Sequence, residues 1–168
     1  SFVVVPLIEI MRTRHIFYLL LLIPLISSCG SSKQSQKQID QIGDILGYAY
    51  KFKGTPYRAG GTSPKGFDCS GYVQYVFKEF NYNLPRTTTD QSKEGQKVDR
   101  QDIRAGDLVF FKGRDKRSKK VGHVGIVTSV DRHGNFRFIH ASSSKGIVET
   151  SISELYYKDR YITARRIV

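Results

Sequence analysis

The spacing of hydrophobic residues changes along the chain from a helical period to a strand period. Apolar side chains recur every three or four residues in 39–49 and again in 73–80, which predicts two amphipathic helices. Beyond residue 91 the period shortens to two, and β-branched and aromatic residues become frequent. Strands are therefore expected at residues 107–112, 121–130, 135–141 and 160–167, with a shorter one near 147–150. Helices followed by antiparallel strands indicate an α+β domain.

A glycine-rich loop joins the two predicted helices. It covers residues 55–66 and contains Tyr57. Asp68 follows at a position where a short polar side chain can cap a helix, so Cys69 would be the first residue of the second helix. A cysteine there lies beside the positive end of the helix dipole.

The first 28 residues have the pattern of an export signal. Two arginines precede an apolar run of 11 residues at 16–26. That run is shorter than the roughly 20 residues that a membrane-spanning helix needs. Because Met11 is the only methionine, residues 1–10 are interpreted as translated upstream sequence. We expect residues 1–28 to be upstream residues plus a lipoprotein signal peptide.

Cys29 follows small residues at the end of this run and resembles the cysteine of a bacterial lipobox, whose thiol is lipidated. The alternative is a buried helix with an incidental cysteine. A lipid anchor at Cys29 would hold the exported protein on a bacterial membrane. Gly30, in place of Asp, favours the outer membrane facing the periplasm if the sorting rule of enteric bacteria applies. Residues 29–38 are expected to be the lipidated cysteine and a flexible tether, and residues 39–168 the folded domain.

Composition and charge narrow the function classes. The chain has 168 residues, of which 39% are hydrophobic, and this argues against a disordered protein. Its formal charge is +12, and the segment 112–120 alone carries six positive charges and one negative charge. This basic segment is either a solvated connection between strands or a surface attracted to an anionic wall or membrane. No aromatic residues alternate with the basic ones, so we expect no nucleic-acid partner, and a monomer is the default.

Cys69 is the candidate nucleophile. The helix N-terminus is expected to lower the pKa of its thiol and so to supply thiolate near neutral pH. Two alternatives are open from position alone: a small buried residue, or a disulfide with Cys29, the second cysteine of the chain. Lipidation of Cys29 would exclude the disulfide.

Two histidines fall in predicted strands, whereas His133 falls in the turn between them. A single histidine in a strand is more often a structural residue than a catalytic one. If the strands pair so that Val130 lies opposite Asn135, His123 and His140 share one face within about 8 Å of each other. A shift by one residue would place them on opposite faces.

These residues suggest roles in nucleophilic catalysis. His123 would accept the proton of Cys69 or hold it in an ion pair, and His140 would orient His123. The backbone N–H of Cys69 and the hydroxyl of Tyr57 could form an oxyanion hole. A zinc site at Cys69, His123 and His140 is the alternative, but the chain has no CxxC or HExxH spacing.

The motifs resemble those of NlpC-type cell-wall cysteine peptidases, in the order of that family and over about residues 40–167. The matching segments are Gly54-Thr55-Pro56-Tyr57-Arg58-Ala59-Gly60-Gly61, Phe67-Asp68-Cys69-Ser70-Gly71, Leu84-Pro85-Arg86-Thr87 with Gln91, Gly106-Asp107-Leu108-Val109-Phe110-Phe111, Gly122-His123-Val124-Gly125-Ile126 and Ile139-His140-Ala141. Within the family, the chain is most similar to short murein endopeptidase lipoproteins.

The resemblance implies a papain-like α+β fold, in which helices pack on a small antiparallel sheet. It implies hydrolysis of amide bonds in peptidoglycan stem peptides or crosslinks by Cys69, His123 and His140 through an acyl-enzyme, without a cofactor or metal. Tyr57 matches a tyrosine beside the nucleophile, and Asp68 and Ser70 match residues of the substrate groove.

Two other functions use the same features. A wall-binding lipoprotein without catalysis would lack one of the motif residues, and none is missing. A papain-like hydrolase or transferase of lipid acyl groups would have an apolar groove beside Cys69, where the peptidase would have a polar one.

Overall fold

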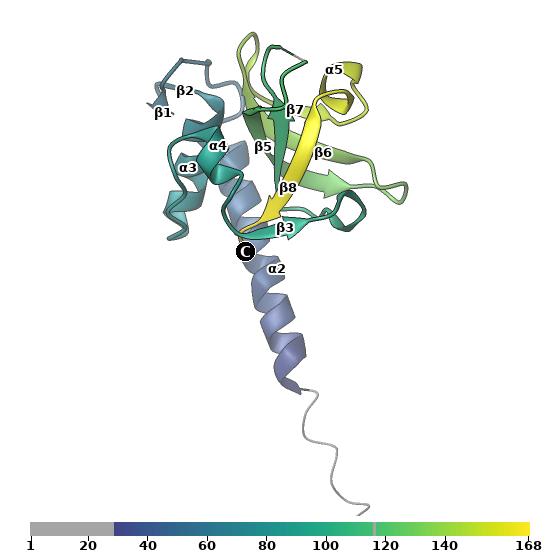
Figure 1. Ribbon diagram of the computed structural model, residues 1–168. Helices are drawn as coiled ribbons and strands as arrows, with labels where there is room; N and C mark the ends of the chain where they lie inside the picture. The colour runs from purple at the N-terminus through teal and green to yellow at the C-terminus, as the bar shows by residue number, and fades with distance from the viewer. Residues whose placement is uncertain (1–28, 116) are drawn as a thin grey trace, which may run out of the picture. The chain divides into compact units, whose positions relative to one another are not determined.

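The computed structural model describes residues 29–115 and 117–168 (Figure 1). The predicted signal at 1–28 lies outside the described residues, and so does the side chain of Cys29, the predicted lipidation site. In the described part of the chain, no helix combines the length and the apolar character needed to cross a membrane. Residues Asp40–Val168 form one compact unit, to which the rest of the description refers.

Four α-helices are described, together with a 3₁₀ turn at Arg100–Asp102. The helices are α2 (Cys29–Tyr50), α3 (Cys69–Glu79), α4 (Thr88–Gln91) and α5 (Leu155–Lys158). The start of α3 at Cys69 confirms the prediction. Residues 30–38 are helical, which differs from the flexible tether expected there. Lys and Gln are good helix formers, so a segment without apolar residues can continue a helix that its neighbours nucleate.

The strands form a two-stranded hairpin and a six-stranded sheet with antiparallel neighbours, ordered β3-β8-β4-β5-β6-β7. The hairpin contains β1 (Thr62–Ser63) and β2 (Gly66–Phe67), and the sheet contains β3 (Gln96–Val98), β4 (Leu108–Lys112), β5 (Val121–Val130), β6 (Phe136–Ser142), β7 (Gly146–Ser151) and β8 (Tyr161–Arg166). Five of these strands were expected from the sequence. The other three have only two or three residues, too few to show a period of two.

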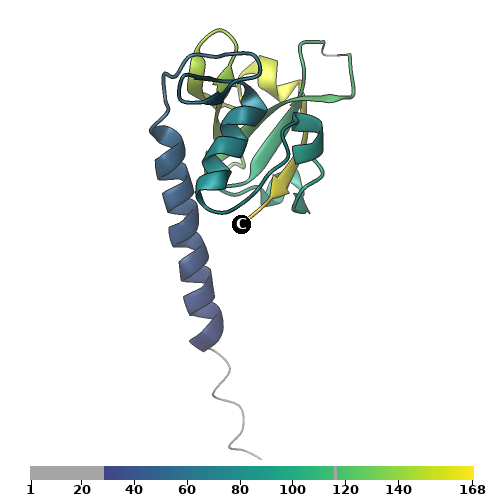
Figure 2. The same cartoon turned by 90° about the vertical axis from the view of Figure 1, so that its left-hand side faces the viewer.

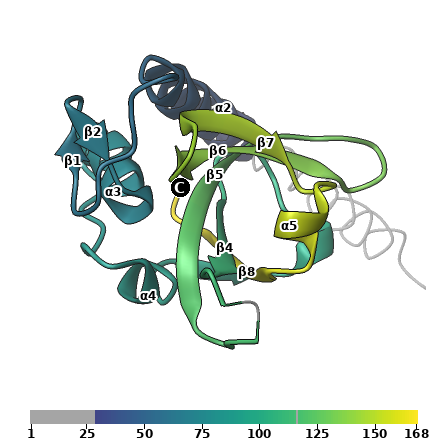
Figure 3. The same ribbon diagram turned by 90° about the horizontal axis from the view of Figure 1, so that it is seen from above.

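The sheet separates two hydrophobic clusters. Seen from above, the sheet is curved, with α2 and α3 outside the curve and α5 within it (Figure 3). Along β4, Leu108 and Phe110 belong to the cluster that includes residues of α2 and α3. Val109 and Phe111 belong to the second cluster, against which Tyr157 of α5 packs. Both faces of β4 are therefore buried, which explains its unbroken apolar run.

The pairing of β5 with β6 contains a β-bulge. Ile126 pairs with Ile139 near the strand histidines, but Val130 pairs with Phe136 near the turn, and the register shifts at Thr128. A bulge inserts one extra residue and so reverses the side-chain alternation beyond it. Near the histidines, the two strands therefore have the register that places His123 and His140 on one face. Near the turn, the register differs by one residue from the pairing of Val130 with Asn135 that was assumed.

Three connections lie at one end of the domain. They are the glycine-rich loop before α3, the loop between β4 and β5, and the turn between β6 and β7 (Figures 1 and 2). Loops carried by rigid strands at one edge of a domain are a common location for functional residues.

Candidate active site

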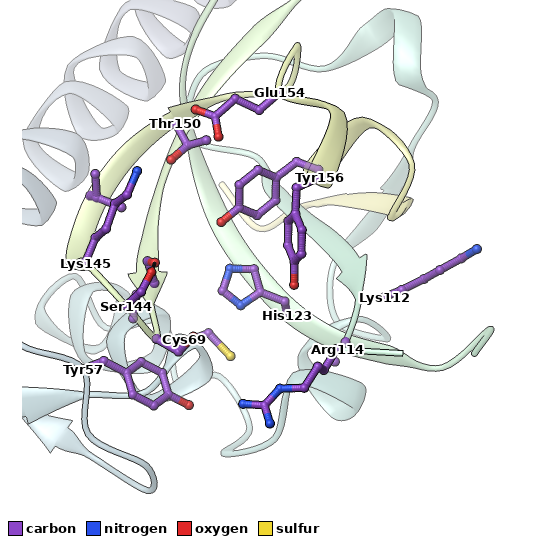
Figure 4. Close-up of a pocket in the computed structure, with 17 residues that line it drawn as sticks. Tyr57, Cys69, Lys112, Arg114, His123, Ser144, Lys145, Thr150, Glu154 and Tyr156 are labelled. Carbon is purple, nitrogen blue, oxygen red and sulfur yellow. Dashed lines mark hydrogen bonds between the residues drawn. The ribbon is translucent and has the colours of Figure 1, made fainter. Parts of the chain in front are cut away.

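A cavity of about 440 Å³ opens at this end of the domain (Figure 4). Its lining includes Cys69 and Tyr57 from the helical side, and His123, Thr150 and Tyr157 from the sheet and α5. Cys69 and His123, far apart in the sequence, therefore face one space.

Local hydrogen bonds place Cys69 at the start of α3. The carboxylate of Asp68 accepts hydrogen bonds from the backbone N–H of Gly71 at 2.7 Å and of Gly60 at 3.0 Å. A Cβ atom on Gly71 would lie 2.1 Å from the carbonyl oxygen of Gly61, so this close approach requires glycine. The glycine-rich loop and the helix cap together hold Cys69 at the cavity wall, with its Sγ 3.6 Å from Oγ1 of Thr88.

Asp68 and Ser70 form a second cluster with Arg86. The guanidinium of Arg86 donates to Oδ1 of Asp68 at 3.1 Å and to Oγ of Ser70 at 2.9 Å. Neither Asp68 nor Ser70 is among the residues that line the cavity. Their described roles are to cap α3 and to fix Arg86, and their contact with substrate stays a prediction.

The electrostatic environment of Cys69 differs from the expectation of an acidified thiol. Burial raises the pKa of the Cys69 thiol above its ordinary value, and the negative charge of Asp68 acts in the same direction. The hydroxyl of Thr88 and backbone groups of Val124 and Ser70 act in the opposite direction without cancelling the effect of burial. The prediction of a lowered pKa was therefore wrong, because it considered the positive end of the helix dipole but not the desolvation of the buried thiol.

The two strand histidines contact each other. Nε2 of His123 lies 3.0 Å from Nδ1 of His140, and their ring centroids are 4.9 Å apart. His140 is buried, and its Nε2 lies 3.1 Å from Oγ1 of Thr150 and 3.3 Å from the hydroxyl oxygen of Tyr157. Among the described residues, no group of three or more His, Cys, Asp or Glu is arranged to hold a metal ion. In this contact Nε2 of His123 and Nδ1 of His140 face each other.

Burial keeps both rings neutral. It lowers the pKa of His123 to about 4 and that of His140 to about 3, with the proximity of His123 as a further cause for His140. Near pH 7 the site therefore combines a protonated thiol with a neutral imidazole. Of the two possibilities for His123, acceptance of the thiol proton fits these values better than a preformed ion pair.

Comparison with known proteins shows which family the chain matches. Residues 54–166 match the NlpC/P60 family. The chain belongs to the NlpC/P60 family. One relative is the murein DD-endopeptidase MepS/murein LD-carboxypeptidase of Escherichia coli, 42% identical over 134 residues, which are 79% of this chain and 66% of the relative. The chain thus matches slightly less than two thirds of that relative's length.

Other NlpC/P60 members agree with this assignment. A probable endopeptidase of Haemophilus influenzae is 41% identical over 119 residues, 70% of each chain. The crystal structure of an NlpC/P60 family protein from Bacillus cereus superposes with a TM-score of 0.68 at 29% identity, covering 75% of this chain and 40% of that one. The α+β fold expected from the resemblance is confirmed.

The remaining residues singled out in the sequence can now be placed within the NlpC/P60 fold. Tyr57 lines the cavity with Cys69, and burial raises its pKa, so its hydroxyl keeps its proton. His133 is exposed in the turn between β5 and β6. Thr88, Thr150 and Tyr157 were not identified from the sequence, because single hydroxyl side chains carry no distinguishing pattern.

Proposed function

We propose that the protein is a peptidoglycan endopeptidase that hydrolyses amide bonds in murein stem peptides or their crosslinks. The observation that carries the proposal is the position of the Cys69 thiol and His123 on one cavity, with His123 held by His140. The named activities of the relatives from Escherichia coli and Haemophilus influenzae supply the reaction class and, for the former, the substrate.

The reaction begins with proton transfer. Because Nε2 of His123 faces His140, Nδ1 is the nitrogen that remains to accept the proton of the Cys69 thiol. The sulfur then forms a bond to the carbonyl carbon of the scissile amide, whose oxygen becomes an oxyanion. The N–H of Cys69, in the first turn of α3, and the hydroxyl of Tyr57 are the donors available to that oxyanion.

Collapse of the tetrahedral intermediate breaks the C–N bond. His123 returns the proton to the departing amine, which leaves an acyl-enzyme thioester at Cys69. Water, deprotonated by His123, attacks the thioester and releases the second product as a carboxylic acid. Cys69 regains its proton and the cycle closes without a cofactor.

The lining of the cavity favours a peptide over a lipid chain. Serines 142–144 and the basic residues Lys112, Arg114 and Lys145 form much of the wall beside Cys69. A hydrolase of lipid acyl groups would need an apolar groove at that position. The cavity instead offers hydrogen-bond donors and positive charge, which suit an acidic peptide.

A digest of purified sacculi and defined muropeptides with the full chain, analysed by mass spectrometry, tests the proposal. We expect new stem-peptide fragments that are absent when Cys69→Ala is used, and their masses identify the cleaved bond. Intact muropeptides with both proteins would contradict the proposal.

We further propose that Cys29 is lipidated and holds the exported protein at the periplasmic face of the outer membrane, as a monomer. Cys29→Ser should then be released into the soluble periplasmic fraction and remain active on muropeptides. Recovery of that variant in the membrane fraction would contradict the anchor.

A further inference from the structure

Positive charge is concentrated on two walls of the cavity. Lys112, Arg114 and Lys145 line it, against one carboxylate, that of Glu154. Figure 4 shows the side chains of Arg114 and Lys145 on opposite sides of Cys69, with the guanidinium of Arg114 turned towards the thiol and the ammonium groups of Lys112 and Lys145 pointing away from it. The β4–β5 loop and the β6–β7 turn therefore each contribute a cationic residue to the cavity, one on either side of Cys69.

The two flanking cations are not neutralised within the described part of the chain. Neither Arg114 nor Lys145 forms an ion pair with a described residue. By contrast, the nearby Arg86 forms an ion pair with Asp68. The charges of Arg114 and Lys145 are thus available to a ligand, and exposure lets both side chains adjust to it.

Close backbone contacts hold the segments that carry these cations. Gly146, at φ +70°, would place a Cβ atom 2.3 Å from the carbonyl oxygen of Thr55, and Ile147 donates a 2.8 Å hydrogen bond to that oxygen. The two residues that follow Lys145 therefore pack closely against the glycine-rich loop. On the other side, a Cβ atom on Gly122 would lie 2.6 Å from the Cα of Gly113, the residue before Arg114.

We propose that Arg114 and Lys145 bind two carboxylates of the substrate, one on each side of the scissile amide. This inference rests on the proposed function and specifies its substrate class: stem peptides whose carboxyl groups beside the cleaved bond are free rather than amidated. The planar guanidinium of Arg114 suits bidentate binding of a carboxylate, and the ammonium of Lys145 acts as a point charge.

The expected preference for free over amidated carboxyl groups is moderate because the side chains of Arg114 and Lys145 are exposed. Loss of one charge-assisted hydrogen bond at such a site should change kcat/KM by roughly three- to tenfold. Salt should weaken the discrimination, since screening at about 1 M shortens the Debye length to about 3 Å.

Four matched synthetic stem peptides test the inference: both carboxylates free, either one amidated, and both amidated. They are assayed with the wild type, Arg114→Gln, Lys145→Gln and the control Lys119→Gln, an exposed cation of the same loop that does not line the cavity. Each amidation should lower the kcat/KM of the wild type and of Lys119→Gln. Arg114→Gln should no longer distinguish free from amidated carboxyl groups on one side of the scissile amide, and Lys145→Gln should no longer do so on the other side. Arg114→Lys should restore part of the preference that Arg114→Gln loses.

Binding of the same peptides to Cys69→Ala, measured by calorimetry, separates this inference from the proposed function. A preference for free carboxylates that disappears in Cys69→Ala/Arg114→Gln and Cys69→Ala/Lys145→Gln supports the two subsites even if no peptide is cleaved. Equal binding and cleavage of acid and amide by the wild type would overturn the inference while leaving the peptidase intact. A preference that survives both Gln variants would also overturn it.

Discussion

Nε2 of His123 lies 3.0 Å from Nδ1 of His140, and this contact determines which proton each ring must carry. For His123 to use Nδ1 as a base, its own proton must lie on Nε2 and be donated to His140. His140 must then hold its proton on Nε2, which faces the hydroxyl groups of Thr150 and Tyr157. Both hydroxyl oxygens can accept the Nε2 proton of His140, so they can stabilise the tautomer in which Nδ1 of His123 is free to accept a proton.

Removal of these hydroxyls should reduce turnover rather than binding. We predict that Tyr157→Phe and Thr150→Val each lower kcat about three- to tenfold with little change in KM, since each deletes a hydrogen bond worth about 1 kcal/mol. Either hydroxyl can accept the Nε2 proton, so the double variant should lose more than the product of the single losses. Steady-state kinetics on one muropeptide measures this, and an unchanged kcat in the double variant would refute the tautomer argument.

Gly125 should be intolerant of a side chain because it packs against His140. A Cβ atom at Gly125 would lie 2.6 Å from Cδ2 of Phe138 and 3.2 Å from Cβ of His140. We predict that Gly125→Ala destabilises the domain by about 1–3 kcal/mol and lowers activity. Gly47→Ala is the matched control, because its added methyl group in α2 would meet no atom beyond the neighbouring helix backbone within 4 Å. Denaturant unfolding of both variants checks this, and equal stability would contradict it.

The neutral thiol and imidazole give the reaction a characteristic pH dependence. His123 must be unprotonated to act as a base, so the acidic limb of kcat/KM should lie near its pKa of about 4 rather than near 6.5. Burial raises the pKa of the Cys69 thiol, so alkylation by iodoacetamide should accelerate only above the pH at which a free thiol ionises, about 8.5. An acidic limb near 6.5, or rapid alkylation at pH 7, would contradict this assignment.

Burial of His140 should also make stability depend on pH. Its pKa is about 3 in the folded domain and 6.5 in the unfolded chain, so its contribution is complete above pH 6.5 and is lost as pH falls towards 3. Within that window it contributes a slope of about 1.4 kcal/mol per pH unit. We expect His140→Asn to reduce the slope of unfolding free energy against pH, whereas His133→Asn, at an exposed position, should leave it unchanged. An equal slope in His140→Asn would exclude this role.

The sequence predicts the parts of this site that depend on local pattern. Asp68 before an apolar stripe located the start of α3, and the β-branched and aromatic residues that become frequent beyond residue 91 located β4, β5 and β6. The pairing of His123 with His140 followed from strand alternation once one register was assumed. These inferences succeed because capping and alternation are short-range constraints.

Features that depend on tertiary contacts were not predictable in the same way. The bulge at Thr128 changes the register between the turn and the histidines, and no residue in the turn predicts a bulge. Tyr157 reaches His140 from α5, a helix too short to show a helical period. The raised pKa of Cys69 reflects how deeply the folded domain covers the thiol, which helix position alone does not reveal.

Hydroxylamine tests most directly whether Cys69 forms a thioester with the substrate. In its presence, a muropeptide cleaved by the wild type should yield the acyl half as a hydroxamate as well as a carboxylic acid, in a ratio that rises with hydroxylamine concentration. Mass spectrometry distinguishes the two, and Cys69→Ala should give neither. Exclusive formation of the acid at every hydroxylamine concentration, or cleavage by Cys69→Ala, would contradict the account.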